Sequence, residues 1–236
     1  MPYTTQTWSS LRDRLADRYE HTPFWTPEEA LIAFNETLYV FNIMTGRWKR
    51  RETLLTVANQ YLYTLSASML YRMRMTVTNL PLSPSSREEL NNGRPRWRSE
   101  TTISGGDVPT RPMLWAPISL RTFYLWPADA VGGLTLTIDG VAATPVLVED
   151  GDTLDLGDEH LNVLLGCALH VLTFTKGGAF FTATEPLWKA FLAACAEENG
   201  QIKTSMTYRR IMGLDRRDLK PYRGASTRLD SSPQAG

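Results

Sequence analysis

Three residues that could act as nucleophiles or metal ligands fall on one predicted apolar helix and its first turn, over residues 157–172. His160, Cys167 and His170 are spaced so that 167 and 170 share a helix face, as do 160 and 167. A cysteine beside a histidine could supply a thiolate nucleophile or two metal ligands. No second cysteine pair or carboxylate ligand set accompanies them, and their neighbours are leucine, valine and alanine. The pattern therefore favours core packing, with His160 in the capping turn.

The acidic stretch over residues 149–159 resembles a calcium-binding loop in composition. Its spacing fails, because Gly151 follows a single pair of adjacent acids and no glutamate lies at the bidentate position. A turn followed by a helix start at Gly157 and Asp158 explains the stretch better. The glycine pairs 132–133 and 177–178 belong to no phosphate-binding pattern, and no G-x-S-x-G elbow occurs. The sequence therefore predicts no catalytic residue, no cofactor and no metal site.

The composition is that of an ordinary folded protein. The chain has 236 residues, of which 42% are hydrophobic and 10% aromatic, and its formal net charge is zero. No apolar run reaches the roughly twenty residues of a membrane span, so no membrane partner is expected. Cys167 and Cys195 both lie on apolar stretches and are expected to be buried free thiols. The polar N-terminus lacks signal-peptide order, which predicts synthesis in a cytoplasm.

Helices are predicted near both ends of the chain, and these must position any functional site. The clearest follows Thr26, which with Pro27 and Glu29 gives an N-cap, a first-turn proline and a capping box, and Gly46 suits the C-cap. The other helices are expected over 9–19, 161–172 and 185–198. The helix over 161–172 is apolar almost all round, which predicts that it is buried or covered by a neighbouring subunit.

The middle of the chain reads as short strands separated by glycine-, proline- and asparagine-rich turns. Alternation is clear over 69–77, where Tyr71, Met73, Met75 and Val77 are expected to share a face opposite the arginines. Many short strands separated by such turns are typical of an antiparallel sandwich or small barrel. Strands are predicted over 54–58, 70–78, 98–103, 118–126, 134–138 and 145–148, with a short helical turn over 86–90.

The predicted fold class is therefore α+β. Helices from both chain ends form a bundle, an antiparallel β-sandwich or barrel-like module is inserted between them, and an extended arm follows. The expected units are 1–47 (N-terminal helices), 48–156 (the β module), 157–200 (C-terminal helices) and 201–236 (basic arm and tail).

The C-terminal arm differs from the rest of the chain in charge. Residues 201–228 hold eight lysines and arginines against two aspartates, a local charge of +6, so the remainder carries −6. Three interpretations stay open: a solvated charged face, docking on an acidic partner subunit, and contact with nucleic-acid phosphates. Apolar and aromatic residues between the charges favour protein docking. The candidate docking residues are Tyr208, Arg209, Arg210, Arg216, Arg217, Lys220, Tyr222 and Arg223.

A family resemblance accompanies these features. The order of weak motifs resembles a head–tail adaptor, or connector, of tailed bacteriophages over about residues 26–214. The motifs are N-terminal helices, then LPLSPSSREEL from Leu80, RPRWR from Arg94, LRTFYLWP from Leu120, LGDEHL from Leu156 and FTKGGAFF from Phe174, followed by Asn199 and Tyr208-Arg-Arg.

The resemblance implies a structural protein of the virion neck rather than an enzyme. It implies a ring, usually of twelve copies, that joins the portal protein to tail tube, nozzle or tail-fibre proteins. Genomic DNA would pass through the ring without sequence-specific binding, which suits a chain of zero net charge. The arm would grip the portal.

Two other functions compete with this one. A β-sandwich that binds carbohydrate or a receptor would display aromatic side chains, for which Trp97, Trp115 and Trp126 are the candidates. A hydrolase on a β-sandwich scaffold is the second, and no motif supports it.

Overall fold

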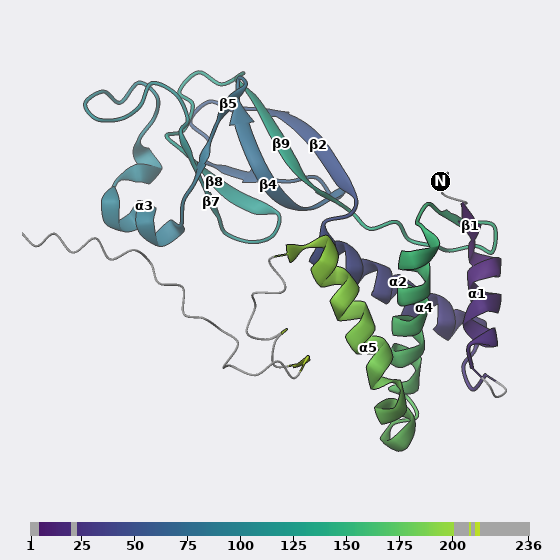
Figure 1. The fold of residues 1–236 in the computed structure, drawn as a ribbon. Coiled ribbons are helices and arrows are strands. Elements are labelled where there is room, and N and C mark those ends of the chain that lie inside the picture. Colours follow the sequence, from purple (N-terminus) through teal and green to yellow (C-terminus); the bar gives the residue numbers. More distant parts are fainter. Residues whose placement is uncertain (1–4, 20–22, 201–207, 209–210, 213–236) are drawn as a thin grey trace, which may run out of the picture.

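The chain folds into a group of helices on one side and a pair of β-sheets on the other, as Figure 1 shows. The computed structural model describes residues 5–19, 23–200, 208 and 211–212. The helices are α1 (Trp8–Asp17), α2 (Pro27–Thr45), α3 (Arg87–Gly93), α4 (Asp158–Thr173) and α5 (Gly178–Glu198). The strands are β1 (Gln6–Thr7), β2 (Lys49–Leu55), β3 (Leu62–Thr64), β4 (Met69–Val77), β5 (Leu80–Pro81), β6 (Ser83–Pro84), β7 (Leu114–Pro117), β8 (Thr122–Trp126), β9 (Thr135–Ala142) and β10 (Thr153–Leu154). The predicted α+β class is confirmed.

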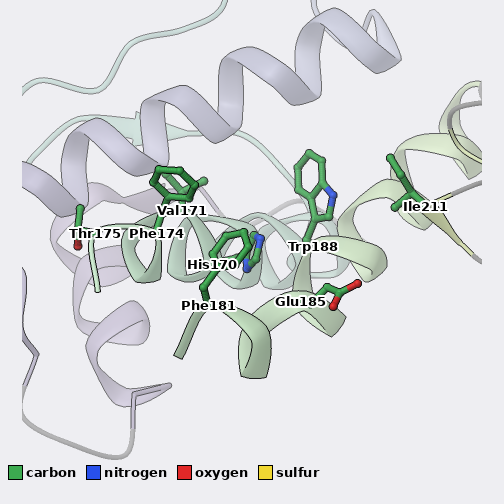
Figure 2. A pocket seen from close by; sticks show the side chains of 8 residues that line it. All are labelled: His170, Val171, Phe174, Thr175, Phe181, Glu185, Trp188 and Ile211. Carbon is green, nitrogen blue, oxygen red and sulfur yellow. The ribbon is translucent and has the colours of Figure 1, made fainter. Parts of the chain in front are cut away.

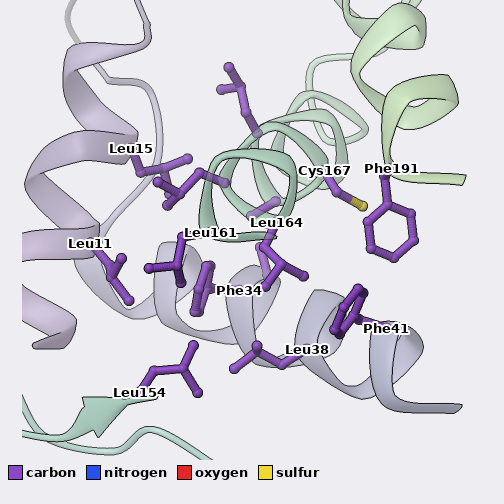
Figure 3. Close-up of a cluster of buried hydrophobic side chains, with 14 of the residues drawn as sticks. Leu11, Leu15, Phe34, Leu38, Phe41, Leu154, Leu161, Leu164, Cys167 and Phe191 are labelled. Atoms are coloured by element: carbon purple, nitrogen blue, oxygen red, sulfur yellow. The ribbon is translucent and has the colours of Figure 1, made fainter. Parts of the chain in front are cut away.

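Helices α1, α2, α4 and α5 form what we call the helical lobe. The start of α2 is as predicted: Thr26 and Glu29 form a reciprocal capping box, Pro27 is the first helical residue, and Gly46 ends the helix at φ +65°. Helix α4 contacts the other three helices, so segments near both chain ends meet in one core. Figure 3 shows this core, which includes Leu11, Leu15, Phe34, Leu38, Phe41, Leu161, Leu164 and Phe191.

The segment before α4 also belongs to this core. Leu147, Leu154 and Leu156 are buried among the helices, and β10 pairs with β1 so that Leu154 lies opposite Gln6. Residues 145–148 form no strand, and the prediction of one there is wrong. Instead, the Asn35 side chain on α2 donates to the Leu147 carbonyl (2.8 Å) and accepts from its amide (3.0 Å), so a side chain replaces a strand partner.

The β lobe comprises β2 to β9 together with α3. One sheet has the strand order β2-β9-β4-β5 and is antiparallel, and the other has the order β3-β8-β7-β6, in which β6 and β7 run parallel. Side chains from both sheets share one core, including Met75 and Ile138 from the first and Phe123 and Leu125 from the second. The sheets therefore pack face to face, and over the described residues neither closes into the predicted barrel alternative.

The strand expected over 98–103 is also wrong. Trp97–Ser99 forms a 3-10 turn after α3, and the Trp97 indole donates to Asn91 Oδ1 at 2.9 Å. Trp97 is buried with Leu90, Ala116 and Trp126 in a small separate core. Burial of one large aromatic side chain and a single β-bridge between Thr101 and Ala128 fix this segment.

Two bulges in β4 break the predicted alternation. The register with β9 shifts between Met69 and Tyr71 and again between Arg72 and Arg74. As a result Arg72 is buried, whereas Met73, expected on the same face as Met75, is 56% exposed. At the bulge β9 contributes Gly140, where an added Cβ would collide with the Tyr71 carbonyl. The close approach of the two strands therefore requires glycine at this position.

Helix α5 begins seven residues before the predicted start at Glu185. Proline favours the first turn of a helix, so a sequence with proline at 186 suggests a helix start nearby. In the structure Pro186 lies in the interior of α5, and the predicted start is too late. The extra turns pack on α4, where Phe181 stacks on His170 with ring centroids 4.5 Å apart. Tertiary contact thus stabilises two turns that local propensity does not predict.

Candidate docking surface

The residues that could carry chemistry on α4 do not form a site. His160 Nε2 lies 3.1 Å from Glu198 Oε1, and His170 Nδ1 lies 2.9 Å from Thr184 Oγ1. Cys167 is buried, and burial raises the pKa of its thiol to about 12, which removes the thiolate needed for nucleophilic attack. No group of three metal-ligating side chains occurs within the described ranges. The three side chains therefore have separate partners.

The acidic stretch before α4 uses its carboxylates locally. Asp152 Oδ2 accepts from the main-chain amides of Val148 (2.6 Å) and Glu149 (2.9 Å), and these bonds lower the pKa of Asp152. Asp150 pairs with an α1 arginine at 2.7 Å, and Asp158 pairs with another at 3.1 Å. The stretch is therefore a turn and a helix start that attach α1, as the spacing predicts, and not a calcium loop.

An apolar groove opens beside the α4–α5 hairpin. It has a volume of about 880 Å³, and Figure 2 shows the aromatic side chains that line it. Trp188 stacks near His170 at 6.2 Å, and burial is the main cause that lowers the pKa of His170, so its imidazole is neutral at pH 7. The groove is thus an uncharged aromatic surface except for Glu185. Its walls include His170, Phe174, Phe181, Glu185, Trp188 and Ile211.

Helix α2 carries a second apolar surface that sequence reasoning missed. Ile32, Tyr39 and Ile43 repeat at intervals of seven and four residues, which places them on one face, opposite the buried Phe34 and Phe41. Ile32 is 59% exposed and Ile43 38%. Helix α4, predicted to be buried or covered by a neighbouring subunit, is buried by the chain's own helices. We call Ile32, Tyr39, Val40 and Ile43 the α2 stripe.

The groove and the α2 stripe are joined into one surface. Val171 of α4 and Thr175 in the turn after it line both the groove and a smaller hollow of about 170 Å³ that also contains Ile32. Glu29 and Glu36 line the same hollow, so carboxylates flank its apolar floor. An apolar surface edged by acids suits a partner that is both apolar and basic. We call this combined area the docking surface.

The predicted arm residues fall mostly outside the described part of the chain. Arg209, Arg210, Arg216, Arg217, Lys220, Tyr222 and Arg223 all lie there. Tyr208 is described and half-buried, and with Ile211 it packs against the core of the helical lobe. Ile211 also forms one wall of the groove. The start of the arm is therefore seated beside the docking surface.

The comparison with protein families decides the identity of the chain. The model of the SU10 adaptor protein family matches residues 6–214 and so spans both lobes and the start of the arm. The chain belongs to the SU10 adaptor protein family. This confirms the resemblance to phage head–tail adaptors.

Membership makes the adaptor a structural component of the phage virion and implies association with portal and tail components. A comparison with curated proteins found no match to the adaptor. Over the described ranges, its helices include none long and apolar enough to cross a lipid bilayer.

Proposed function

We propose that this adaptor forms a ring, with twelve copies as the expected number, between the portal and the tail. In this arrangement the helices of residues 1–47 and 157–200 form the ring body. The β module, expected over 48–156, contacts tail tube, nozzle or fibre proteins. The arm, residues 201–236, grips the portal through Tyr208 and the basic residues that follow it. Genomic DNA passes through the ring, and a chain of zero net charge suits passage without tight binding.

The observation that carries this proposal is the docking surface left uncovered by a single chain. Phe174 is 72% exposed in the turn that joins α4 to α5, and Ile32 is 59% exposed on α2. Monomeric proteins rarely leave a contiguous apolar area of this kind in water, whereas subunits of obligate assemblies do. Burying one such side chain stabilises a contact by about 1.5–3 kcal/mol. Family membership supports the same assignment.

The charge distribution supports an arm that acts on another subunit. Residues 201–228 of the arm carry +6 and the remainder of the chain −6. An arm that orders on binding loses conformational entropy, and a ring offsets this loss because each bound arm holds the others near their sites. Attraction between opposite charges also speeds the encounter.

Light scattering on the purified protein, alone and mixed with portal assemblies, tests the proposal. We expect either a ring from the start or a monomer that gains mass only on the portal. A monomer that shows no change in mass with portal at micromolar concentration overturns the proposal.

The carbohydrate-binding alternative loses most of its support in the structure. Trp97 and Trp126 are 1% and 4% exposed, and their indole N–H groups donate to Asn91 and Glu100. Only Trp115 of the three is half-buried, and it lies beside an arginine. A glycan platform needs exposed aromatic faces, which these side chains do not supply.

A further inference from the structure

Arg72 joins the two sheets of the β lobe. The bulge in β4 turns its side chain inward, and Nη1 donates to the carbonyls of Ser119 (2.9 Å) and Leu120 (2.8 Å) in the turn between β7 and β8. Its guanidinium carbon lies 5.0 Å from the ring centroid of Trp115 and 5.7 Å from that of Phe123. The charge is therefore held in one place by two carbonyls and two aromatic rings.

The positive charge of Arg72 has no anionic partner in the described chain. Its residue is only 9% exposed, Nε is buried without an acceptor, and among the described residues Arg72 forms no ion pair. Burial alone lowers the pKa of Arg72, with no opposing carboxylate. Buried charges in folded proteins are normally paired, because an unpaired one is destabilising. Arg51, two strands away, shows the usual pattern, since it pairs with Asp139 at 2.7 Å.

A cavity lies beside Arg72. It has a volume of about 440 Å³, and Tyr71, Arg72 and Trp115 line it. The turn at its mouth exposes apolar side chains: Leu120 is 63% exposed and Ile118 43%. The site thus combines one fixed cation, an aromatic wall and an apolar rim.

We propose that this cavity binds a carboxylate of a partner protein that is flanked by an apolar side chain, either an acidic side chain or a C-terminal carboxylate. The guanidinium supplies charge-assisted hydrogen bonds to the carboxylate. Trp115 and the exposed Ile118 and Leu120 contact the flanking apolar group. A phosphate of DNA fits less well, because a phosphate-binding surface needs several exposed cations, and Arg72 is the cation that lines this cavity.

This inference goes beyond the proposed function, because it assigns a ligand to the β lobe and needs neither a ring nor a portal. Its test uses the full chain labelled with ¹⁵N at arginine and tryptophan and follows the arginine Nε–H and tryptophan indole N–H resonances. N-acetyl-leucine, a carboxylate with an apolar side chain, is the probe. N-acetyl-leucine amide is its matched neutral control, and inorganic phosphate is added separately.

We expect N-acetyl-leucine to shift the Arg72 resonance in a saturable way, with the amide and phosphate at least about tenfold weaker. The resonance is assigned from its absence in Arg72→Lys. That variant keeps the positive charge but loses the planar guanidinium with its paired N–H donors. It should bind N-acetyl-leucine about tenfold more weakly, as read from the shift of the Trp115 indole resonance. Arg74→Gln, on an exposed neighbour in β4, is the control and should bind as the unaltered protein does.

Three results would overturn the assignment. The first is no shift with the carboxylate at tens of millimolar, which leaves Arg72 as a clamp between the two sheets. The second is an equal shift with the amide, which means that charge is not recognised. The third is preference for phosphate, which points to nucleic acid instead. If Arg72→Lys does not fold, the Arg72 resonance is assigned by triple-resonance NMR, and the unaltered protein still gives all three results.

Discussion

The side-chain oxygen of Asn42 accepts a hydrogen bond from the main-chain amide of Trp48 at 3.2 Å, at the point where the chain leaves the helical lobe. The Asn42 amide donates to the Ala142 carbonyl and to Thr144 Oγ1, both at 3.0 Å, where the chain returns. Asn42 is fully buried. One side chain therefore binds both connections between the lobes.

Replacing Asn42 with alanine should destabilise the protein by about 1–3 kcal/mol, because buried main-chain groups lose their partners. Urea denaturation measures the change. Asn92→Ala, on the exposed surface of α3, is the control and should change the free energy of unfolding by less than about 0.5 kcal/mol. Equal effects of the two substitutions would show that the Asn42 bonds contribute nothing.

The α2 stripe should control assembly without affecting the fold. The double substitution Ile32→Lys and Ile43→Lys places two charges on the docking surface, and light scattering should show a lower mass or loss of portal binding. The melting temperature of the monomer should stay within about 2 °C, because both residues are exposed. Val146→Lys and Val148→Lys, which are exposed away from the stripe, form the control pair. Unchanged mass in the stripe variant would exclude this face as an interface.

Two truncations separate the arm's packing from its docking. Removing residues 213–236 leaves Tyr208 and Ile211 on the helical core, so the melting temperature should not change but binding to portal should be lost. Removing residues 201–236 should also lower stability by roughly 1–3 kcal/mol through lost apolar burial. Portal binding by the shorter truncation would contradict the proposed role of the basic residues.

Both cysteines should resist modification in the folded protein. Burial raises the pKa values of Cys167 and Cys195 to about 12, so at pH 8 almost no thiolate is present. We expect a thiol reagent to label neither in native buffer and both in urea, as counted by mass spectrometry. Rapid native labelling would mean that α4 and α5 separate readily.

The ionisation of Asp129 should make the free energy of unfolding depend on pH in the acidic range. Burial raises the pKa of its carboxyl, but hydrogen bonds from Thr56 Oγ1 (2.5 Å) and from main-chain amides outweigh burial and lower it overall. A lowered pKa in the folded state stabilises the protein above the unfolded pKa, near pH 4, and this contribution is lost as the pH falls through the folded value. Asp129→Asn should therefore flatten the dependence of unfolding free energy on pH below about 4. An identical dependence in the variant would contradict the assignment.

The elements that sequence predicts well are those set by local chemistry. The start and end of α2 follow from Thr26, Pro27, Glu29 and Gly46, each of which acts within one turn of itself. The expected strand over 70–78 closely matches β4, because alternation is a local signal. The core helix α4 is likewise evident from its leucines.

What the sequence could not show depends on distant partners. The inward turn of Arg72 depends on bulges set by pairing with β9, and the first turns of α5 depend on contacts with His170. The α2 stripe was present in the spacing of Ile32, Tyr39 and Ile43, but a helix with two apolar faces does not reveal which one the chain covers. Identification of the docking surface therefore required the packed helices.

The paired connections at Asn42 have a consequence for how this protein can be altered. The Ala142 amide donates to the Trp48 carbonyl at 2.7 Å, and Lys49 and Val141 lie opposite each other as β2 and β9 begin and end their pairing. The chain thus leaves and rejoins the helices through one narrow antiparallel stem. We expect such a stem to let a short hairpin or a different domain replace the β lobe while the helices keep their fold.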